Sequence, residues 1–321
     1  MKSINVGPQP GELWRGLHIL LNDDEEVAAL TGEVSALAKT GINVIVAEID
    51  YHYAYSTHPE LREEHHVGRE AARTLVRACT DHAVRLIPQF QCLGHQSWGN
   101  TTHPLLVRYP EFDETPGMYP GNEGIYCRSW CPQHPQVNPI IFALFDELLE
   151  VFQADGLHVG MDEVFLIASD CCPRCKGHDP ARLFAGAVND YHARLVDERG
   201  VEMLMWGDRL LDSQTTGYGE WEAAANGTHL AVYLIPRDIV ICDWHYTPRD
   251  HYPSIPFFLR QGFRVWPAGW KDVEAVEALI RYALEYRDGG MLGYLCTTWG
   301  AVRPGELAHW PPLQKAMAML C

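Results

Sequence analysis

The segment GLHVGMDEV, at residues 156–164, decides the fold: an almost wholly apolar run ends on two adjacent acids. The run is too short for a helix, and it lacks the alternation of a strand with one exposed face. Such a run is typical of a parallel strand that is covered on both faces. We therefore predict a buried strand whose carboxyl end presents Asp162 and Glu163.

The same unit recurs along the chain. Eight short apolar runs that read as strands span residues 13–20, 43–50, 84–90, 156–160, 201–206, 239–244, 263–266 and 291–296. Helical spacing of apolar residues predicts helices over residues 23–39, 69–84, 139–152, 181–198, 272–286 and 312–320, with weaker signals at 219–226 and 254–261. Eight alternating strands and helices predict a (β/α)8 TIM barrel of the α/β class, as a single domain over residues 1–321. An open, doubly wound sheet is the alternative, although no GxGxxG follows the first strand and no GxxxxGK[ST] occurs.

The charge balance excludes several classes of partner. The chain has 25 Lys and Arg against 42 Asp and Glu, a formal net charge of −17. Nucleic acids and anionic membranes bind clustered positive charge, so we expect neither as a partner. No uncharged apolar run approaches the roughly 18 residues of a membrane span, and the N-terminal residues lack the apolar core of a signal peptide. We therefore expect a cytoplasmic protein.

The ten cysteines are unevenly placed. The chain is far longer than a secreted disulfide scaffold, so most of them read as reduced, buried side chains. Cys127 and Cys131 stand four residues apart, and Cys172 and Cys175 lie in the run CCPRC. These four either form a structural zinc site, pair as disulfides or stay free.

Reactive side chains follow the predicted strands, at the end where a barrel of this type carries its active site. In strand order they are Arg15 and His18 inside the first strand, then Asn22, Asp23, Glu48, Asp50, Tyr51, His52, His95, Asp162, Glu163, Trp206, Asp208, Asp243, Trp244, His245, Tyr246, Trp266, Trp270 and Trp299. Flat aromatic faces stack on the C–H faces of sugar rings, so tryptophans at the ends of strands five to eight favour a carbohydrate substrate. The alternative is that they fill the core. The long connection over residues 94–135 is also expected to be functional.

The adjacent acids Asp162 and Glu163 suit one kind of chemistry. In a half-buried site their pKa values separate, so that one stays ionised while the other holds a proton. Acid-catalysed glycoside cleavage requires that division. A solvated pair that caps the next helix is the alternative.

The segment LHVGMDEV resembles the signature of glycoside hydrolase family 20, the β-N-acetylhexosaminidases, in which an Asp–Glu pair ends the fourth strand. Further segments resemble that family in the same order: LWRGLHIL, GINVIVAEID, VRLIPQFQCLGH, MLMWGDRL, ICDWHY and TTWG. The resemblance covers nearly the whole chain and implies hydrolysis of terminal β-linked GlcNAc or GalNAc. It also allows a homodimer, since barrels of this family can complete a pocket with a neighbour's loop.

The resemblance implies a retaining, substrate-assisted mechanism that needs no cofactor or metal. The substrate's own 2-acetamido oxygen attacks the anomeric carbon, Glu163 acts as general acid and then as base, and Asp162 holds the acetamide N–H and stabilises the oxazolinium charge. The implied substrate-binding residues are Arg15, His95, Trp206, Asp208, Trp244, Tyr246 and Trp299.

The sequence departs from the family pattern at three places. Glu48 stands where the family usually has His. The tyrosine that bonds the acetamide carbonyl is missing from the seventh strand, and Tyr246 is our substitute. Ala301 stands where an acid contacts sugar hydroxyls, and Glu306 is the nearest acid. These departures leave the identity of the sugar open.

Two other functions remain compatible with the sequence. A sugar isomerase or epimerase on the same barrel would hold a divalent metal with Glu48, Asp50, His95, Glu163, Asp208 and Asp243. A non-catalytic sugar-binding barrel would keep the tryptophans but has no use for the acid pair.

Overall fold

The computed structural model describes residues 6–321 as a closed barrel of eight parallel strands. Around the barrel the strand order is β1-β10-β9-β8-β7-β6-β3-β2. The strands are β1 (Trp14–Leu20), β2 (Val44–Glu48), β3 (Arg85–Cys92), β6 (Gly156–Gly160), β7 (Glu202–Trp206), β8 (Val240–Trp244), β9 (Arg264–Gly269) and β10 (Gly293–Thr297). Each coincides within a few residues with one of the eight predicted runs. The predicted TIM barrel is confirmed, and the doubly wound alternative is wrong because β1 pairs with β10 and closes the sheet.

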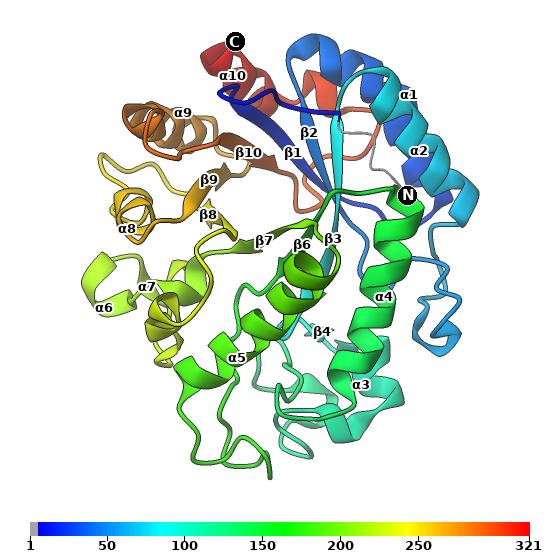
Figure 1. The fold of residues 1–321 in the computed structure, drawn as a ribbon, viewed down its shortest axis with the longest axis vertical. Helices are drawn as coiled ribbons and strands as arrows, with labels where there is room; N and C mark the ends of the chain where they lie inside the picture. Colours follow the sequence, from blue (N-terminus) through cyan, green and yellow to red (C-terminus); the bar gives the residue numbers. More distant parts are fainter. Residues whose placement is uncertain (1–5) are drawn as a thin grey trace.

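Helices surround the barrel (Figure 1). They are α1 (Asp24–Thr40), α2 (Arg69–Asp81), α3 (Pro104–Arg108), α4 (Val137–Phe152), α5 (Pro180–His192), α6 (Ser213–Thr216), α7 (Gly219–Glu222), α8 (Ser254–Arg260), α9 (Val273–Ala283) and α10 (Pro311–Leu320). A π-helical turn over Ala193–Glu198 continues α5 to the predicted end. The weak signal at 219–226 corresponds only to the four-residue α7, so the barrel wall there is built mostly from short turns.

Local chemistry explains where the longer helices begin. The side chains of Asp23, Asp179 and Asp272 each accept backbone N–H bonds in the first turn of α1, α5 and α9. A carboxylate there satisfies donors that have no partner within the helix and complements the positive end of the helix dipole. At the other end of α1, Gly41 takes a left-handed conformation (φ 112°) that returns the chain to β2.

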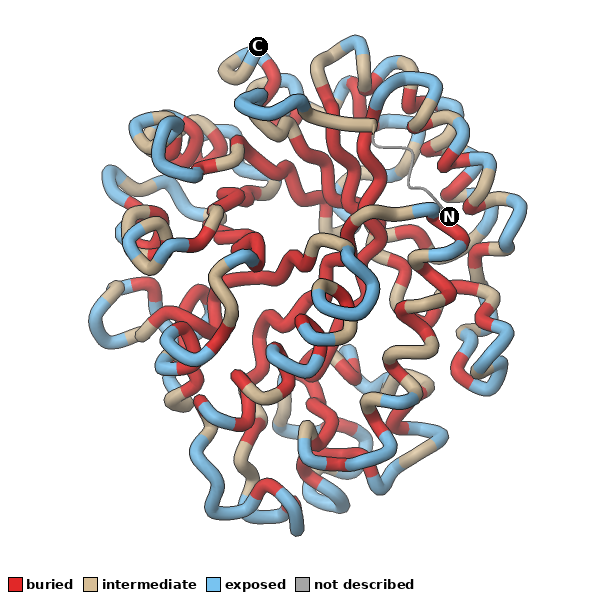
Figure 2. Tube along the Cα trace, in the orientation of Figure 1, coloured by how far each residue is buried: buried red, intermediate tan, exposed pale blue. Residues whose placement is uncertain are grey.

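The core has two parts, one on each side of the strands. Apolar side chains on the inner face fill the barrel; they include Val46, Ile87, Leu204, Trp206 and Trp266. A larger cluster packs the outer face of the strands against the helices. Figure 2 shows the strands buried along most of their length and exposure concentrated on the outer helices and loops. This two-sided burial explains why the strands lack an alternating pattern.

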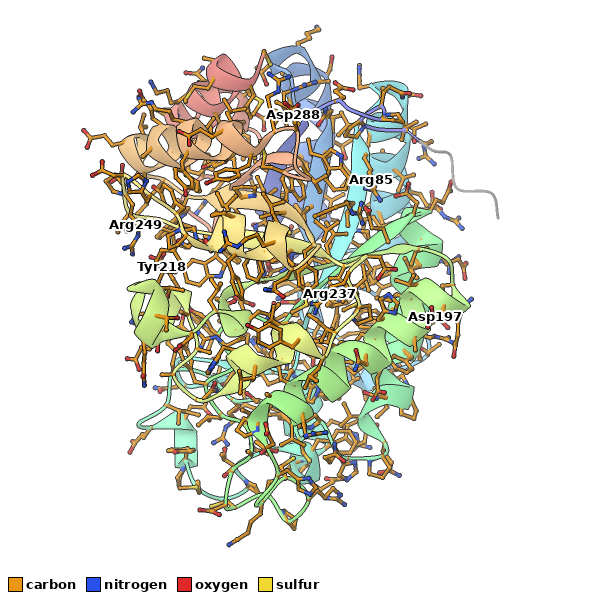
Figure 3. The ribbon with its side chains drawn as sticks, turned by 60° about the vertical axis from the view of Figure 1, so that its left-hand side comes forward. Arg85, Asp197, Tyr218, Arg237, Arg249 and Asp288 are labelled. Atoms are coloured by element: carbon orange, nitrogen blue, oxygen red, sulfur yellow. The ribbon has the colours of Figure 1, made fainter. Side chains whose placement is uncertain are left out.

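Ion pairs bind strands together at the amino-terminal end of the barrel. Arg85, at the start of β3 and labelled in Figure 3, donates to Asp155 at 2.8 Å and to Glu202 at 2.7 Å. Arg264 pairs with the other oxygen of Glu202. These contacts hold together the starts of β3, β7 and β9 at the end opposite the cavity described below.

The long connection between β3 and α4 lies at the carboxyl end of the strands. It holds the short hairpin β4 (Ser97–Trp98) and β5 (Thr101–Thr102), followed by α3 and 3-10 turns. In Figure 1 this segment and the β6–α5 loop occupy the lower part of the molecule. No helix among residues 6–321 is long and apolar enough to cross a membrane.

Candidate active site

A cavity of about 600 Å³ opens at the carboxyl ends of the strands, within the size range of small-molecule sites. Its lining residues are Leu20, Asn22, Glu48, Ile49, Asp50, His52, Gln91, His95, Trp98, His103, Tyr126, Asp162, Glu163, Trp244, Tyr246, Trp270, Trp299 and Gly300. The lining combines acids with aromatic rings. Six of the nine predicted site residues therefore meet here: Asp162, Glu163, His95, Trp244, Tyr246 and Trp299.

The acid pair lies directly after β6, on a strained turn. Met161 and Glu163 have positive φ angles of 78° and 50°, which side-chain-bearing residues rarely adopt. Gly160 (φ 67°) is required there, because a Cβ would come within 2.0 Å of Gln91 Oε1. His95 (φ 53°) is strained in the same way on the neighbouring β3 side. Backbone strain of this kind concentrates at functional sites, where the surrounding structure holds it in place.

Asp162 is held in its ionised form. Burial by itself raises the pKa of this carboxyl, but the charge of His95, together with a hydrogen bond from Gln91, holds the pKa below its usual range. Gln91 Nε2 donates to Asp162 Oδ1 at 2.6 Å, and His95 Nε2 lies 3.4 Å from Oδ2. Burial likewise opposes the charge of His95, yet Asp162 and Glu163 raise its pKa well above the usual value. The result is an imidazolium that lies beside both acid side chains.

Glu163 is positioned from several sides. Its Oε2 lies 2.9 Å from His95 Nε2, and its backbone N–H donates to Asp208 Oδ2 at 2.9 Å. Asp208 also accepts from Arg209 Nε at 2.7 Å. Burial raises the pKa of Asp208 to about 6, against the lowering effect of Arg209. Tyr126 lies beside Glu163: burial and then the Glu163 charge raise the pKa of its phenol.

Aromatic rings from the ends of β8, β9 and β10 form a second part of the cavity wall. Trp244 stacks on Tyr246, with ring centroids 4.9 Å apart. Trp299 Nε1 donates to the Tyr246 hydroxyl oxygen at 2.6 Å, which leaves the hydroxyl proton free for another acceptor. Trp270, which the sequence placed after the seventh strand, fixes its ring by donating to the Thr298 carbonyl at 2.8 Å. These side chains give the cavity an aromatic wall.

Three predicted binding residues lie outside the cavity wall. Arg15 is the second residue of β1, about 16 Å in strand length from Leu20, which lines the cavity. Its Nε donates to the Gly41 carbonyl at 2.5 Å, so the prediction that it grips a sugar is corrected. Trp206 is fully buried and packs behind Trp299, with centroids 5.7 Å apart. Asp208 holds the Glu163 backbone and is a positioning residue.

The cavity contains two more acids, at the end of β2. Glu48 Oε2 lies 2.7 Å from His18 Nε2 and accepts from Gln89 Nε2 at the same distance. Burial, and secondarily the Asp162 charge, raise the pKa of Glu48 to about 8. Burial and Glu48 raise the pKa of Asp50 to about 7. Both pKa values are thus shifted toward neutral pH, so these two carboxyls bind protons far more readily than exposed acids do.

Some functional residues carried no sequence signal. Gln91 is the penultimate residue of β3, where its residue type did not mark it, and Tyr126 lies in no motif; the folding of β3 and of the long connection brings both to the acids. Trp98 could have been found as one of the tryptophans in that connection. Glu306, the substitute acid for Ala301, is exposed and does not line the cavity.

The metal-site alternative finds little support in the geometry. Within residues 6–321 one group at the cavity could share an ion: His95, Asp162 and Glu163. Asp243, a predicted ligand, instead accepts from Ser254 Oγ at 2.6 Å and contacts His245 at 3.2 Å outside the cavity. Glu222 contacts His245 and pairs with Arg249, whose guanidinium lies over the Tyr218 ring; Arg249 and Tyr218 are labelled in Figure 3. The six predicted ligands therefore do not converge.

Comparison with known proteins agrees with this architecture. A curated β-hexosaminidase of Akkermansia muciniphila is 26% identical over 108 residues, which are 34% of this chain and 21% of that protein. The chitobiase of Flavobacterium johnsoniae superposes with a TM-score of 0.68 at 18% identity, over 96% of this chain and 48% of that one. A β-N-acetylhexosaminidase of Bacteroides fragilis gives a TM-score of 0.69 at 14% identity, over 96% and 66%. The chain thus spans about a fifth of the curated relative and from half to two thirds of these structures.

The model of the glycosyl hydrolase family 20 catalytic domain matches residues 54–255, more than half of the chain. The match includes β3 with His95, the acid pair after β6 and the aromatic end of β8. With the closed barrel and the cavity at its carboxyl end, this match shows that the chain belongs to glycosyl hydrolase family 20.

Proposed function

We propose that this chain is the catalytic domain of an exo-acting β-N-acetylhexosaminidase that releases terminal GlcNAc or GalNAc with retention of configuration. The observation that carries the proposal is the Asp162–Glu163 pair, with Asp162 kept ionised by His95 and Gln91, in a cavity that is also lined by aromatic rings. A cavity of about 600 Å³ suits a terminal sugar and its first neighbour better than a long polymer.

The charges suit a reaction in which the substrate supplies the nucleophile. The 2-acetamido carbonyl oxygen attacks the anomeric carbon as the bond to the leaving oxygen breaks, and Glu163 gives that oxygen its proton. The Glu163 carboxylate then takes a proton from a water molecule that opens the oxazolinium ring at the same carbon. The two inversions give net retention, an exception to the scheme with a protein nucleophile.

Asp162 has a separate task in this reaction. Its ionised carboxylate accepts the acetamide N–H and balances the positive charge that develops on the ring nitrogen. Its fixed orientation, set by Gln91 at 2.6 Å, means that little reorganisation is needed when that charge appears. His95 cannot take over this role, because it is itself a cation beside Asp162.

The aromatic wall suits the acetamido group. The Tyr246 hydroxyl accepts from Trp299 and has its own proton to donate to the acetamide carbonyl. The rings of Trp244 and Trp299 exclude water from the methyl group and from the reacting carbon. This arrangement favours a 2-acetamido sugar over one with a 2-hydroxyl.

The test compares three aryl glycosides with the same leaving group: β-GlcNAc, β-GalNAc and β-glucoside. We expect hydrolysis of at least one 2-acetamido substrate and strong inhibition by a thiazoline that mimics the bicyclic intermediate. Equal rates on the β-glucoside would overturn the proposal, because that sugar has no internal nucleophile. So would a fluorosugar ester trapped on Asp162 and identified by peptide mass spectrometry.

A further inference from the structure

Four buried side chains converge outside the active site, where two loops meet. Glu114 and Cys131 belong to the long β3–α4 connection, while Cys172 and Cys175 belong to the β6–α5 loop. One ligand atom from each residue lies within 4.8 Å of all the others. The two loops lie in the lower part of Figure 1, at the carboxyl end of the barrel.

The sulfur atoms are spaced for a shared ion. Cys131 Sγ lies 3.3 Å from Cys172 Sγ and 3.4 Å from Cys175 Sγ. A disulfide bond joins sulfurs at about 2.05 Å. A tetrahedral ion with sulfur bonds of about 2.3 Å holds its sulfurs about 3.8 Å apart. A small outward movement of the thiols would therefore complete such a site.

Backbone hydrogen bonds build the site. Glu114 N–H donates to the Ser129 carbonyl at 3.0 Å and Cys131 N–H to the Phe112 carbonyl at 2.6 Å, so these two segments run antiparallel. The segment between Cys172 and Cys175 turns tightly, with the Lys176 N–H donating to the Cys172 carbonyl at 3.0 Å. Two cysteines separated by two residues on such a turn are typical of structural zinc sites.

Glu114 adds an independent observation. Its side chain is fully buried, and its Oε1 accepts the Ser169 N–H at 2.9 Å. Its Oε2 is buried and, among residues 6–321, has no hydrogen-bond partner. Burying an unpaired carboxylate oxygen is costly unless a cation or a donor satisfies it. The oxygen lies among three thiols, which together with it make a set of metal ligands.

We propose that Glu114, Cys131, Cys172 and Cys175 bind a structural zinc ion. Three thiolates favour zinc over magnesium or calcium, which prefer oxygen ligands, and four protein ligands leave no open position for catalysis. This assignment corrects the set expected from the sequence. Cys127 lies elsewhere, with its Sγ 3.6 Å from the Glu163 carbonyl oxygen, and Glu114 takes its place.

The ion has a structural consequence for the active site. It joins the connection that carries His95 and Tyr126 to the loop that follows Asp162 and Glu163. These two loops are far apart in sequence, and a metal that closes such a long segment reduces the freedom of the unfolded chain. Zinc therefore stabilises the cavity wall without contact with the substrate.

The test counts metal in the purified full chain. After expression with added zinc and purification with a reductant, we expect about one zinc per chain by inductively coupled plasma mass spectrometry. Reconstitution with cobalt(II) should give the thiolate charge-transfer bands and the visible spectrum of a tetrahedral ion. Cys131→Ser and Glu114→Gln should lower the zinc content and the melting temperature, whereas Cys171→Ser, at an exposed cysteine beside the cluster, should leave both unchanged.

The zinc content of the wild-type chain tests the proposal even if the cluster variants fail to fold. Wild-type chain that is folded but holds less than about a tenth of an equivalent of zinc, before and after reconstitution, would overturn it. A disulfide between Cys131 and Cys172 or Cys175, found by intact mass and peptide mapping without alkylation artefacts, would overturn it too. Neither result depends on hydrolysis, so the proposed function is tested separately.

Discussion

Replacing His95 with asparagine tests whether the imidazolium keeps Asp162 ionised. Asparagine tolerates the positive φ of 53° at this position better than other residues with a side chain, so the backbone turn is expected to survive. The substitution removes the positive charge 3.4 Å from Asp162 Oδ2 and leaves Gln91 in place. The pKa of Asp162 should therefore rise, because burial is no longer opposed by a cation.

The size of this rise follows from the geometry. Two unit charges 3.4 Å apart interact by about 5 kcal/mol at an effective dielectric constant of ~20. That energy corresponds to about 3.5 pKa units at 1.36 kcal/mol per unit. Water that enters the space left by the imidazole will stabilise the carboxylate, so we expect a rise of about 1–3 units.

The assay is the pH dependence of kcat/KM on a neutral aryl glycoside, which reports ionisations in the free enzyme. Asp162 must be ionised to act. The acidic limb of the kcat/KM profile should therefore move to higher pH by about 1–3 units in His95→Asn. His58→Asn is the matched control, because His58 pairs with Glu60 at 2.9 Å away from the cavity lining. An acidic limb that stays in place, with an equal loss of rate at every pH, would refute the electrostatic role of His95.

Unfolding by urea gives a second readout of the same pair. The folded pKa of Asp162 is lowered, so its contribution to stability is present above the unfolded value of about 3.9 and is lost as the pH falls through the folded value. The folded pKa of His95 is raised, so its contribution is present below about 6.5 and is lost as the pH rises through the folded value. The stability difference between wild type and His95→Asn should thus be largest between about pH 4 and 6.5.

Four further changes test the other parts of the site. Glu163→Gln should lower turnover at least ~100-fold on glycosides with poor leaving groups and much less on acidic phenols; equal losses would exclude the acid role. Asp162→Asn should lower kcat ~100–1000-fold with little change in the Kd of the product sugar measured by calorimetry, and a matching loss of affinity would contradict a role in the transition state. Tyr246→Phe should weaken thiazoline inhibition by ~1–3 kcal/mol, and an unchanged Ki would remove its hydroxyl from the acetamide site. Trp221 is half-exposed, and its ring centroid lies 4.9 Å from that of Tyr126, so we expect its ring to contact the leaving group. Trp221→Ala should then raise KM for disaccharides but not for aryl glycosides, and an equal rise for both would refute the contact with the leaving group.

The barrel and its acid pair could be predicted from the sequence because both depend on local pattern. A strand buried on two faces needs a short run of apolar residues, and eight such runs appear in the chain at the positions of the eight strands. In a closed parallel barrel every strand ends on the same side, so Asp162, Glu163, His95 and Trp299 had to gather there.

The depth of a residue within its strand was harder to predict from the sequence. Arg15 and Trp206 lie in predicted strands, but the sequence does not show which residues of a strand reach the cavity. Arg15 falls at the amino-terminal end of β1 and Trp206 behind another ring, because strand register and packing decide their depth. The burial depth of a residue depends on the register of its strand against the neighbouring strands, and that register is set by the closure of the whole barrel.

Only the tertiary structure decided the electrostatics of the site and the membership of the cysteine cluster. The ionised state of Asp162 depends on β3 lying beside β6, which brings Gln91 and His95 to its carboxylate across about 70 residues of chain. The cysteine spacing predicted four sulfurs, but the pairing of the two loops places Glu114 among three of them and turns Cys127 toward Glu163. Contacts between residues so distant in sequence are set by how whole elements pack, and no local pattern of residue types records them.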